Sequence, residues 1–277
     1  MSKILITGDI HGQYKPIKEI ITKANLNNKD IIVLLGDAGF NFFFNYRDKK
    51  FKEKINSYGI IIFTIRGNHE ERPSICAAAA PERWHTEDFW ENKVYVENDY
   101  PNIKYALDVP AKYEIPTAQG TPIKTLVLPG AYSVDKYYRI ANGWSWFEQE
   151  QLSKEEMAVG TNLALFNSWD MVLSHTCPIS YEPTDLFLRT VDQSTVDKTM
   201  ERWLGGLEYQ MSYKLWCWGH YHSNRVYPHY NNSDRLMLFN DCYCDVYKYF
   251  CGNYNIIDCL IKVNEDTKIT NINGLFC

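Results

Sequence analysis

Three short apolar runs near the amino terminus each lead to a glycine and then to a polar residue. The runs cover residues 4–6, 31–35 and 60–63, and the polar residues after them are Asp9, Asp37 and Asn68. Runs rich in Ile and Val are typical of buried parallel strands. Open α/β sheets place their sites at the carboxyl ends of such strands. The pattern therefore predicts an α/β protein with its site at one end of a sheet.

Helical spacing of apolar residues separates the first two runs. Ile17, Ile20 and Ile21 repeat with this spacing within residues 14–24, which predicts a helix in a right-handed crossover between parallel strands. Further helices are expected at 47–58 and 148–166, and a third ends where Pro81 stops a run of alanines.

The remaining strands are shorter and their arrangement is harder to assign. Residues 93–115 alternate around a turn-rich connector and predict a hairpin or meander. Further strands are expected at 123–128, 170–173 and 214–218. Three short runs in the tail, at 225–227, 236–239 and 259–263, are interpreted as edge strands of a second sheet.

Length and composition favour one large domain over two small ones, because the polar blocks are spread over the chain of 277 residues. We expect one domain over residues 1–277, with a helical cap or lid at 178–206. The amino-terminal apolar run is too short for a signal peptide, and no stretch has the length of a membrane span. Eight cysteines without a CxxC pair do not predict disulfides. These features predict a cytoplasmic protein with no membrane partner.

Seven polar residues offer the chemistry of a metal site. They supply two carboxylates, four imidazoles and one amide, which suffices for two ions with four protein ligands each if one carboxylate is shared. Mixed nitrogen and oxygen ligands favour first-row divalent ions. The residues are Asp9, His11, Asp37, Asn68, His175, His220 and His222.

The blocks that contain these residues resemble, in order, those of the calcineurin-like metallophosphoesterases. The matching blocks are Asp9-x-His11, Gly36-Asp37, Gly67-Asn68-His69-Glu70, Ser174-His175 and Gly219-His220-x-His222. The resemblance implies a four-layer α/β/β/α sandwich with the metal site on loops at one end. The apolar pattern alone does not distinguish this sandwich from a single wound sheet.

The resemblance also implies the role of each ligand. Asp9, His11 and His222 would hold the first ion, Asn68, His175 and His220 the second, and Asp37 would bridge them. The cofactors would be two divalent transition metal ions, Mn, Fe or Zn, with manganese favoured in vitro. Two such ions can clamp a phosphate and activate a bridging hydroxide for attack on phosphorus. A phosphomonoester or phosphodiester would be hydrolysed.

His69 is the candidate general acid, since it stands beside Asn68 and the departing oxygen needs a proton. In the family this histidine often pairs with a carboxylate. Glu70 is adjacent, but a role in capping the following turn explains it equally well. The other two histidines, His85 and His229, are interpreted as structural.

One block differs from the Ser/Thr protein phosphatase branch of the family, which the residues of other blocks resemble. That branch continues Gly-Asp with an Asp-Arg pair, and this chain has Phe40 and Asn41 there. The Arg that binds phosphate is thus missing, which argues against a protein phosphatase. Asn41 and Arg139 are the candidate substrate-binding residues, the latter from the stretch 131–139. Lys136, Arg66 and Arg72 are weaker candidates, and a solvated surface loop also explains 131–139.

Several functions stay open at this stage. The expected partner is a small phosphorylated substrate. A net charge of −5 gives no general field for nucleic acid, so a nuclease or nucleotide phosphodiesterase is an alternative without support from charge. Aromatic residues, 15% of the chain, could still stack one or two bases. A silent binding scaffold is a further alternative, although every predicted ligand is retained. The oligomeric state is not encoded in the pattern.

Overall fold

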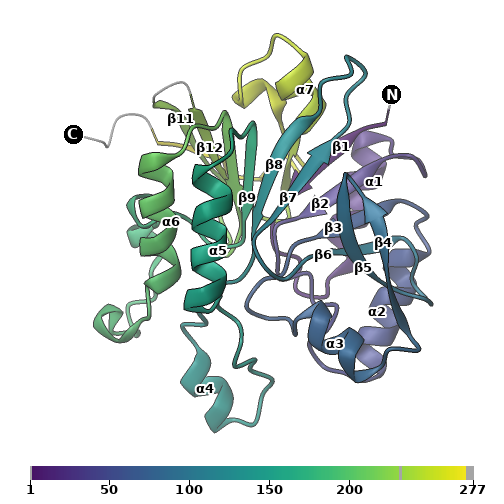
Figure 1. Ribbon diagram of the computed structural model, residues 1–277, viewed down its shortest axis with the longest axis vertical. Helices are drawn as coiled ribbons and strands as arrows, with labels where there is room; N and C mark the ends of the chain where they lie inside the picture. Colours follow the sequence, from purple (N-terminus) through teal and green to yellow (C-terminus); the bar gives the residue numbers. More distant parts are fainter. Residues whose placement is uncertain (1, 231–232, 273–277) are drawn as a thin grey trace.

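The structure is a computed structural model that describes residues 2–230 and 233–272, and its strands form two stacked sheets (Figure 1). In the described residues the first sheet has the order β14-β13-β1-β2-β3-β6-β5-β4. Strands β1, β2, β3 and β6 run parallel, and the remaining pairs are antiparallel. The strands are β1 (Ile4–Thr7), β2 (Ile31–Leu34), β3 (Ile61–Thr64), β4 (Trp84–Phe89), β5 (Asn92–Glu97), β6 (Ile103–Ala106), β13 (Cys242–Asp245) and β14 (Leu260–Lys262).

The second sheet has the order β15-β11-β12-β10-β9-β8-β7 over the same described ranges. Its centre is parallel, because β8, β9, β10 and β12 run in one direction. The strands are β7 (Ala111–Ile115), β8 (Ile123–Leu128), β9 (Met171–Ser174), β10 (Leu215–Trp218), β11 (Arg225–Tyr230), β12 (Ser233–Met237) and β15 (Thr270–Asn271).

Helices cover the outer face of each sheet (Figure 1). Alternate residues of β1 explain the layers, because Ile4 and Ile6 pack between the sheets while Leu5 packs under the helices of the first sheet. Helices α1 (Tyr14–Ala24), α2 (Tyr46–Asn56) and α3 (Pro73–Ala79) cover the first sheet, and α5 (Lys154–Leu165) and α6 (Thr199–Gln210) cover the second. The predicted α/β/β/α sandwich is confirmed.

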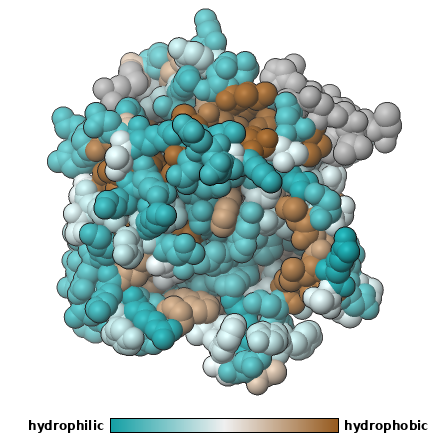
Figure 2. All heavy atoms as spheres, turned by 180° about the vertical axis from the view of Figure 1, so that it is seen from behind, coloured by the Kyte–Doolittle hydropathy of each residue, from teal (hydrophilic) through white to brown (hydrophobic). Residues whose placement is uncertain are grey.

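Short helical segments complete the described structure. Helix α4 (Lys136–Ala141) lies in the connection between β8 and α5, and α7 (Val246–Cys251) follows β13. The 3-10 helices are η1 (Ile179–Tyr181), η2 (Thr184–Leu186), η3 (Gln193–Thr195) and η4 (Ile257–Cys259). Among the described residues no helix combines the length and the apolarity needed to cross a bilayer. The face in Figure 2 is mostly hydrophilic, with apolar residues in separate small patches.

Most predicted elements are present, and the differences concern short strands. The helix at 14–24 and the strand at 123–128 match α1 and β8 residue for residue. The prediction that 259–263 joins the second sheet is wrong, because β14 pairs with β13 at the edge of the first sheet. Strand β4 and helix α7 were not predicted. The loop expected at 131–139 ends in helix α4.

Candidate metal centre

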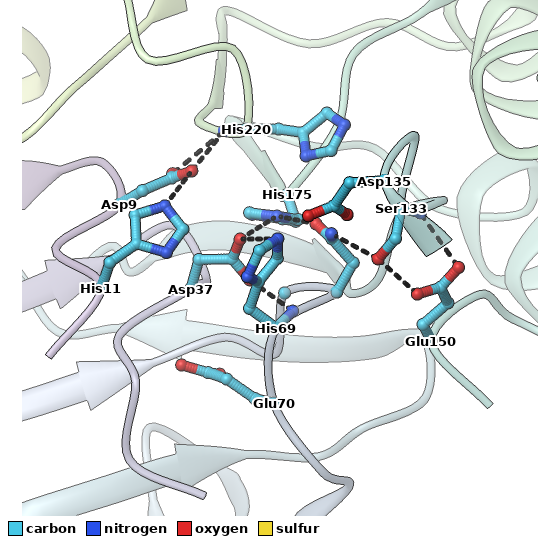
Figure 3. Close-up of polar contacts among 12 residues, drawn as sticks. Asp9, His11, Asp37, His69, Glu70, Ser133, Asp135, Glu150, His175 and His220 are labelled. Carbon is cyan, nitrogen blue, oxygen red and sulfur yellow. Dashed lines mark hydrogen bonds and ion pairs between the residues drawn. The ribbon is translucent and has the colours of Figure 1, made fainter. Parts of the chain in front are cut away.

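The predicted ligands follow the carboxyl ends of five parallel strands that belong to both sheets. Asp9 follows β1, Asp37 follows β2 and Asn68 follows β3, all in the first sheet. His175 and His220 follow β9 and β10 in the second sheet. Figure 3 shows Asp9, Asp37, His175 and His220 around one region, and Oδ1 of Asn68 lies 2.9 Å from Nε2 of His175. Stacking the two sheets therefore brings together residues that are more than two hundred positions apart.

Asp9, His11 and His222 form the first of the clusters that could hold an ion. Nε2 of His222 lies 3.4 Å from Oδ2 of Asp9, and Nε2 of His11 lies 3.8 Å from the same oxygen. The two imidazole nitrogens are 2.8 Å apart. One carboxylate and two imidazoles from distant segments thus face a common point, as the predicted first ion requires.

Asp9, Asp37 and His175 form a second cluster, in which all three residues are buried. Nε2 of His175 lies 3.5 Å from Oδ2 of Asp37 and 2.9 Å from Oδ1 of Asn68. Nδ1 of His175 is 2.6 Å from the carbonyl oxygen of Leu35, to which it donates. This hydrogen bond fixes the tautomer and leaves the lone pair of Nε2 facing the carboxylates, as in ligating histidines.

His220 borders these clusters, and its ring nitrogens do not belong to them. Its ring centroid lies 5.0 Å from that of His175. Its backbone N–H donates to both carboxylate oxygens of Asp9, at 3.0 and 3.1 Å. His220 therefore orients Asp9 through its backbone, and its ring lies within reach of the centre.

The backbone at the site is held in an uncommon conformation. Four of the seven predicted ligands have positive φ: His11 at 44°, Asp37 at 48°, His220 at 68° and His222 at 50°. Residues other than glycine rarely adopt this left-handed region, and such strain concentrates at functional sites. The observation supports a site built for a ligand.

Two glycines let the carboxylates approach the backbone. A Cβ added at Gly67 would lie 2.0 Å from Oδ1 of Asp37, and one at Gly219 would lie 2.2 Å from Oδ1 of Asp9. Neither glycine has a positive φ, so close packing and not backbone geometry requires them. Each predicted carboxylate ligand is thus seated on a neighbouring loop.

Buried groups of opposite charge shift one another's pKa at the site. Burial would raise the pKa of Asp37, but the nearby charges of His175 and His69 outweigh this and hold the pKa well below its usual value. Burial would lower the pKa of His175, but Asp37 and Asp9 raise it to about 9. The cluster thus favours positive charge between its carboxylates, and bound divalent ions would replace the protons. Donor types and charge both fit the metal ions that the sequence implies.

His69 lies between the cluster and an arginine from α4. Its backbone N–H donates to Oδ1 of Asp37 at 2.8 Å. Nη2 of Arg139 is in contact with both ring nitrogens of His69, 2.9 Å from Nε2, and Nε of Arg139 donates to Asp135 at 3.0 Å. Burial lowers the pKa of His69 to about 4, with Asp37 opposing and Arg139 adding to the shift. The free imidazole is therefore neutral at pH 7.

The alternative interpretation of 131–139 as a solvated loop is wrong for Arg139. This side chain is only 2% exposed and packs over the ring of Phe42, with its guanidinium carbon 5.5 Å from the centroid. Asp135 holds it from the preceding helical turn. The structure thus places Arg139 on a helix and beside His69, and its role in substrate binding stays a prediction.

Asn41 does not come to the site. Its side chain is buried, accepts a hydrogen bond from Nζ of Lys52 at 2.7 Å, and lines a different cavity. The residue after Gly36-Asp37-Ala38-Gly39-Phe40 turns away because Phe40 fills the core under α2, where it stacks on Phe51. The prediction of Asn41 as a substrate-binding residue has no support from its position.

Two other arginines and Glu70 have structural partners. Arg72 pairs with both carboxylate oxygens of Glu156, and Arg66 donates to the carbonyl oxygen of Glu150 at 2.6 Å. Glu70 accepts from the backbone N–H of Gly39 at 2.8 Å and points away from the His69 ring (Figure 3). Its role is therefore to hold the loop after β2, not to orient His69.

A chain of residues behind Asn68 was not predicted. Nδ2 of Asn68 donates to Oγ of Ser133 at 2.9 Å, and Ser133 donates to Glu150 at 2.5 Å (Figure 3). Trp146 donates to the same carboxylate oxygen at 3.0 Å. The chain assigns the amide so that Oδ1 of Asn68 faces His175. In the sequence, only the polar stretch after β8 and the tryptophan cluster pointed to this region. Neither pattern indicates which residue contacts Asn68.

A cavity of about 330 Å³ opens beside the cluster. Asp37, Asn68, His69, His220 and His222 line one end. The other end is lined by residues between 182 and 201, within the segment predicted as a cap. Its role as a cap stays a prediction, but its position over the cavity agrees with that role.

Comparisons with known proteins agree with this geometry. A family model described as calcineurin-like phosphoesterase matches residues 2–224. Among curated proteins a sequence search found no match. Several solved structures resemble the fold. A protein from Thermus thermophilus is 12% identical, and the likeness covers 95% of this chain and 99% of that chain with a TM-score of 0.50.

A second crystal structure is 13% identical over 89% of this chain and 95% of that chain, with a TM-score of 0.50. The 5′-nucleotidase from Candida albicans is 13% identical over 96% of this chain and 52% of that chain, with a TM-score of 0.46. The first two likenesses bear on the fold alone. The family match spans every predicted ligand, and this metal-dependent family hydrolyses phosphoric esters. The chain therefore belongs to the calcineurin-like phosphoesterase family.

Proposed function

We propose that this protein is a dinuclear metal-dependent phosphoesterase that acts on a small phosphomonoester or phosphodiester. The observation that carries the proposal is that Asp9 and Asp37 each belong to two overlapping clusters, in each of which the ligand atoms lie within 4.8 Å of one another. Five strands from both sheets lead to these clusters. Two buried carboxylates this close together are costly to maintain without a bound cation.

The two ions would be divalent transition metals, Mn, Fe or Zn. Asp9, His11 and His222 would hold the first, Asn68, His175 and His220 the second, and Asp37 both. When bound, the ions supply positive charge for the phosphate and a water of lowered pKa. The remaining chemistry is positioning, charge neutralisation and proton transfer by the chain itself.

His69 would donate the proton to the departing oxygen. It lines the cavity beside Asn68, and Arg139 stands against its ring. The neutral imidazole of the free site must gain a proton first. A phosphate dianion bound beside it would favour that gain, because a nearby negative charge raises the pKa of an imidazole. His69 is thus a general acid that becomes charged when the substrate binds.

Arg139 would replace the phosphate-binding arginine that the second block lacks. Asp135 accepts from its Nε and the carbonyl oxygen of Ser145 from its Nη1, while Nη2 lies next to His69, which lines the cavity. A planar guanidinium suits two phosphate oxygens at once. Asn68 stays directed at the ions because Ser133 holds its amide nitrogen. The substrate phosphate would therefore lie between the ions, His69 and Arg139.

A nuclease or nucleotide phosphodiesterase is the second candidate. The observation that favours it is a group of exposed aromatic residues near Arg139: Phe43, Phe44, Tyr137, Tyr138 and Trp144 are between 43% and 71% exposed. Exposed rings can stack bases. Against long polynucleotides stand the net charge of −5 and a cavity of about 330 Å³, which suits a small ligand.

The test is a substrate screen of protein reconstituted separately with Mn, Fe and Zn. Comparing p-nitrophenyl phosphate with bis-p-nitrophenyl phosphate separates monoesterase from diesterase activity. Nucleotides, cyclic nucleotides, dinucleotides, phosphopeptides and single-stranded DNA then identify the substrate class. We expect metal-dependent hydrolysis of small esters that chelation abolishes. Stoichiometric metal without hydrolysis of any ester would instead indicate a binding scaffold, and turnover of phosphopeptides alone would indicate a protein phosphatase.

A further inference from the structure

The part of the cavity lined by the segment between 182 and 201 has its own chemistry. Its wall comes from the segment between η1 and α6, which contributes five apolar residues beside Glu182, Gln193, Asp197 and Lys198. The apolar lining residues are Leu186, Phe187, Leu188, Val191 and Val196. Glu201, in the first turn of α6, lines the same region. A carboxyl group that is almost fully buried requires a reason.

One oxygen of Glu201 is satisfied and the other is not. The side chain is 4% exposed, and Oε1 accepts from Oγ1 of Thr176 at 2.7 Å. Oε2 is buried and has no hydrogen-bond partner among the described residues. Leaving a buried acceptor unpaired is unfavourable, and more so when it is charged. The folded protein thus keeps an unpaired acceptor on a residue that lines a cavity.

The neighbouring donors are already used. Oγ1 of Thr176 gives its proton to Glu201, so the hydroxyl of Tyr221, 3.2 Å from Oγ1, is the donor in that contact. Sγ of Cys177 in turn donates to the Tyr221 hydroxyl at 3.5 Å. Each donor in this chain points toward Oε1. Glu201 also lines the cavity, so a molecule bound there is the partner that we assign to Oε2.

The neighbouring charged groups do not form an ion pair with Glu201 among the described residues. Glu182 is paired with Lys198, with Nζ 2.7 Å from Oε2 of the carboxylate. Asp197 accepts from the backbone and hydroxyl of Thr199. Burial raises the pKa of Glu201 to about 7, which shows how much its ionised form lacks a partner. A second anion would be repelled here, and a donor or cation would be stabilised.

We propose that this part of the cavity binds the leaving group of the substrate, an apolar body of ring size whose far end carries an ammonium or N–H donor for Oε2 of Glu201. The identification as a leaving-group site rests on the proposed function, since the same cavity is lined by predicted metal ligands. The binding site itself rests on the cavity and on Glu201.

Binding is tested first, without metal or turnover. The affinities of full-length protein for 4-(aminomethyl)phenol and for 4-methylphenol, which differ only by the amine, are measured by calorimetry or ligand-observed NMR. We expect the amine to bind at least about tenfold more tightly, a typical value for one charged hydrogen bond. In Glu201→Gln this ratio should fall to about twofold or less. The exposed Glu265→Gln is the matched control and should keep the wild-type ratio.

Equal affinities in the wild-type protein would overturn the proposal, and so would a ratio that Glu201→Gln leaves unchanged. If Glu201→Gln fails to fold, the wild-type comparison still decides the ligand chemistry. Val191→Phe, which narrows the apolar wall from a half-buried position, then decides the location: both phenols should bind several times more weakly. Unchanged affinities in Val191→Phe would contradict the assigned cavity.

Hydrolysis is tested second, with metal-loaded protein. The ratio of kcat/KM for 4-(aminomethyl)phenyl phosphate to that for 4-methylphenyl phosphate is compared between wild type and Glu201→Gln, so that intrinsic reactivity cancels. We expect the ratio to fall about as much as the binding ratio. Hydrolysis with an unchanged ratio would overturn the inference while the proposed function stands. Selective binding without any hydrolysis would support the site and overturn the proposed function.

Discussion

The guanidinium of Arg139 lies against the imidazole of His69, with Nη2 2.9 Å from Nε2. Two groups that can both carry positive charge are held together by Asp135 on one side and Asp37 on the other. The contact is favourable only while His69 is neutral or while an anion lies beside both groups. The pair is therefore suited to bind an anion and then to release a proton.

His69→Ala tests the proton donor. A general acid contributes about 10²–10⁴-fold, and it matters most when the leaving group is a poor alkoxide. We expect turnover of alkyl phosphates to fall within that range, while that of nitrophenyl esters falls far less and metal content stays near normal. His85→Ala, at an exposed position, is the control. Equal losses on both ester classes would remove the role.

Arg139→Lys tests phosphate binding. The substitution keeps the positive charge and removes the planar guanidinium, which can bind two phosphate oxygens at once. Because a charged hydrogen bond is worth about 1.5–3 kcal/mol, we expect KM to rise about tenfold. In Arg139→Ala, which also removes the charge, KM should rise further. Arg83→Lys on the surface should change nothing. Because Arg139 is buried, the melting temperature is measured alongside the kinetics. A lower melting temperature with unchanged KM would assign the residue a structural role only.

Asp37→Asn tests the bridging carboxylate. Removing one negative charge shared by both predicted ions should lower the occupancy of both, which elemental analysis of reconstituted protein measures. Asp30→Asn is the comparison, because Asp30 is equally buried but accepts from the backbone of Lys3 and Asn27. That variant should lose stability and keep its metals. Two retained ions in Asp37→Asn would contradict the bridge.

Gly67→Ala tests the seating of Asp37. The new Cβ would come within 2.0 Å of the carboxylate, so we expect the loop to shift, with lower metal occupancy and lower stability. Gly206→Ala, in the interior of α6 with open space around it, should instead stabilise the protein by about 0.5–1 kcal/mol. Chemical denaturation and metal analysis of the two variants measure the contrast. An unperturbed metal content in Gly67→Ala would show that the loop is more adaptable than its packing indicates.

Glu201 should impose a pH dependence on stability. Burial raises its pKa from 4.5 to about 7, so the folded protein holds the proton more tightly than the unfolded chain. The stabilisation of the folded state by this bound proton is fully present below pH 4.5 and is lost as the pH rises to about 7. It contributes about 3 kcal/mol at most to the free energy of unfolding. Between pH 4.5 and 7 the free energy of unfolding should therefore fall less in Glu201→Gln than in the wild-type protein. The same dependence on pH in both proteins would refute this prediction.

Sequence patterns predicted the parts of the fold that local periodicity and strand ends determine. Strands β1, β2 and β3 were found because apolar runs end at glycine, and their polar followers converge at the site. Strand β14 was assigned to the wrong sheet because its partner, β13, is set by pairing with β1 over more than two hundred residues. Alternation carries no information on which sheet a short strand joins.

The residues of the site also fall into those that the sequence predicts and those that it does not. Ligand types and spacing within each block identify the metal-binding residues, but the direction of a loop side chain depends on packing. Asn41 was misplaced because Phe40 anchors the loop in the core. The Ser133–Glu150 support of Asn68 and the acceptor on Glu201 arise from contacts between distant segments. Common residue types in irregular segments give no sign of such contacts.

The positive φ angles at four predicted ligands have one more consequence. A loop that relaxed to ordinary backbone angles would swing its side chain out of the cluster, so the packed sheets must keep these three loops, after β1, β2 and β10, in this conformation before any ion arrives. Capture of the ions would then require little rearrangement of the main chain, and rapid loading at a preformed centre is the behaviour that this backbone favours.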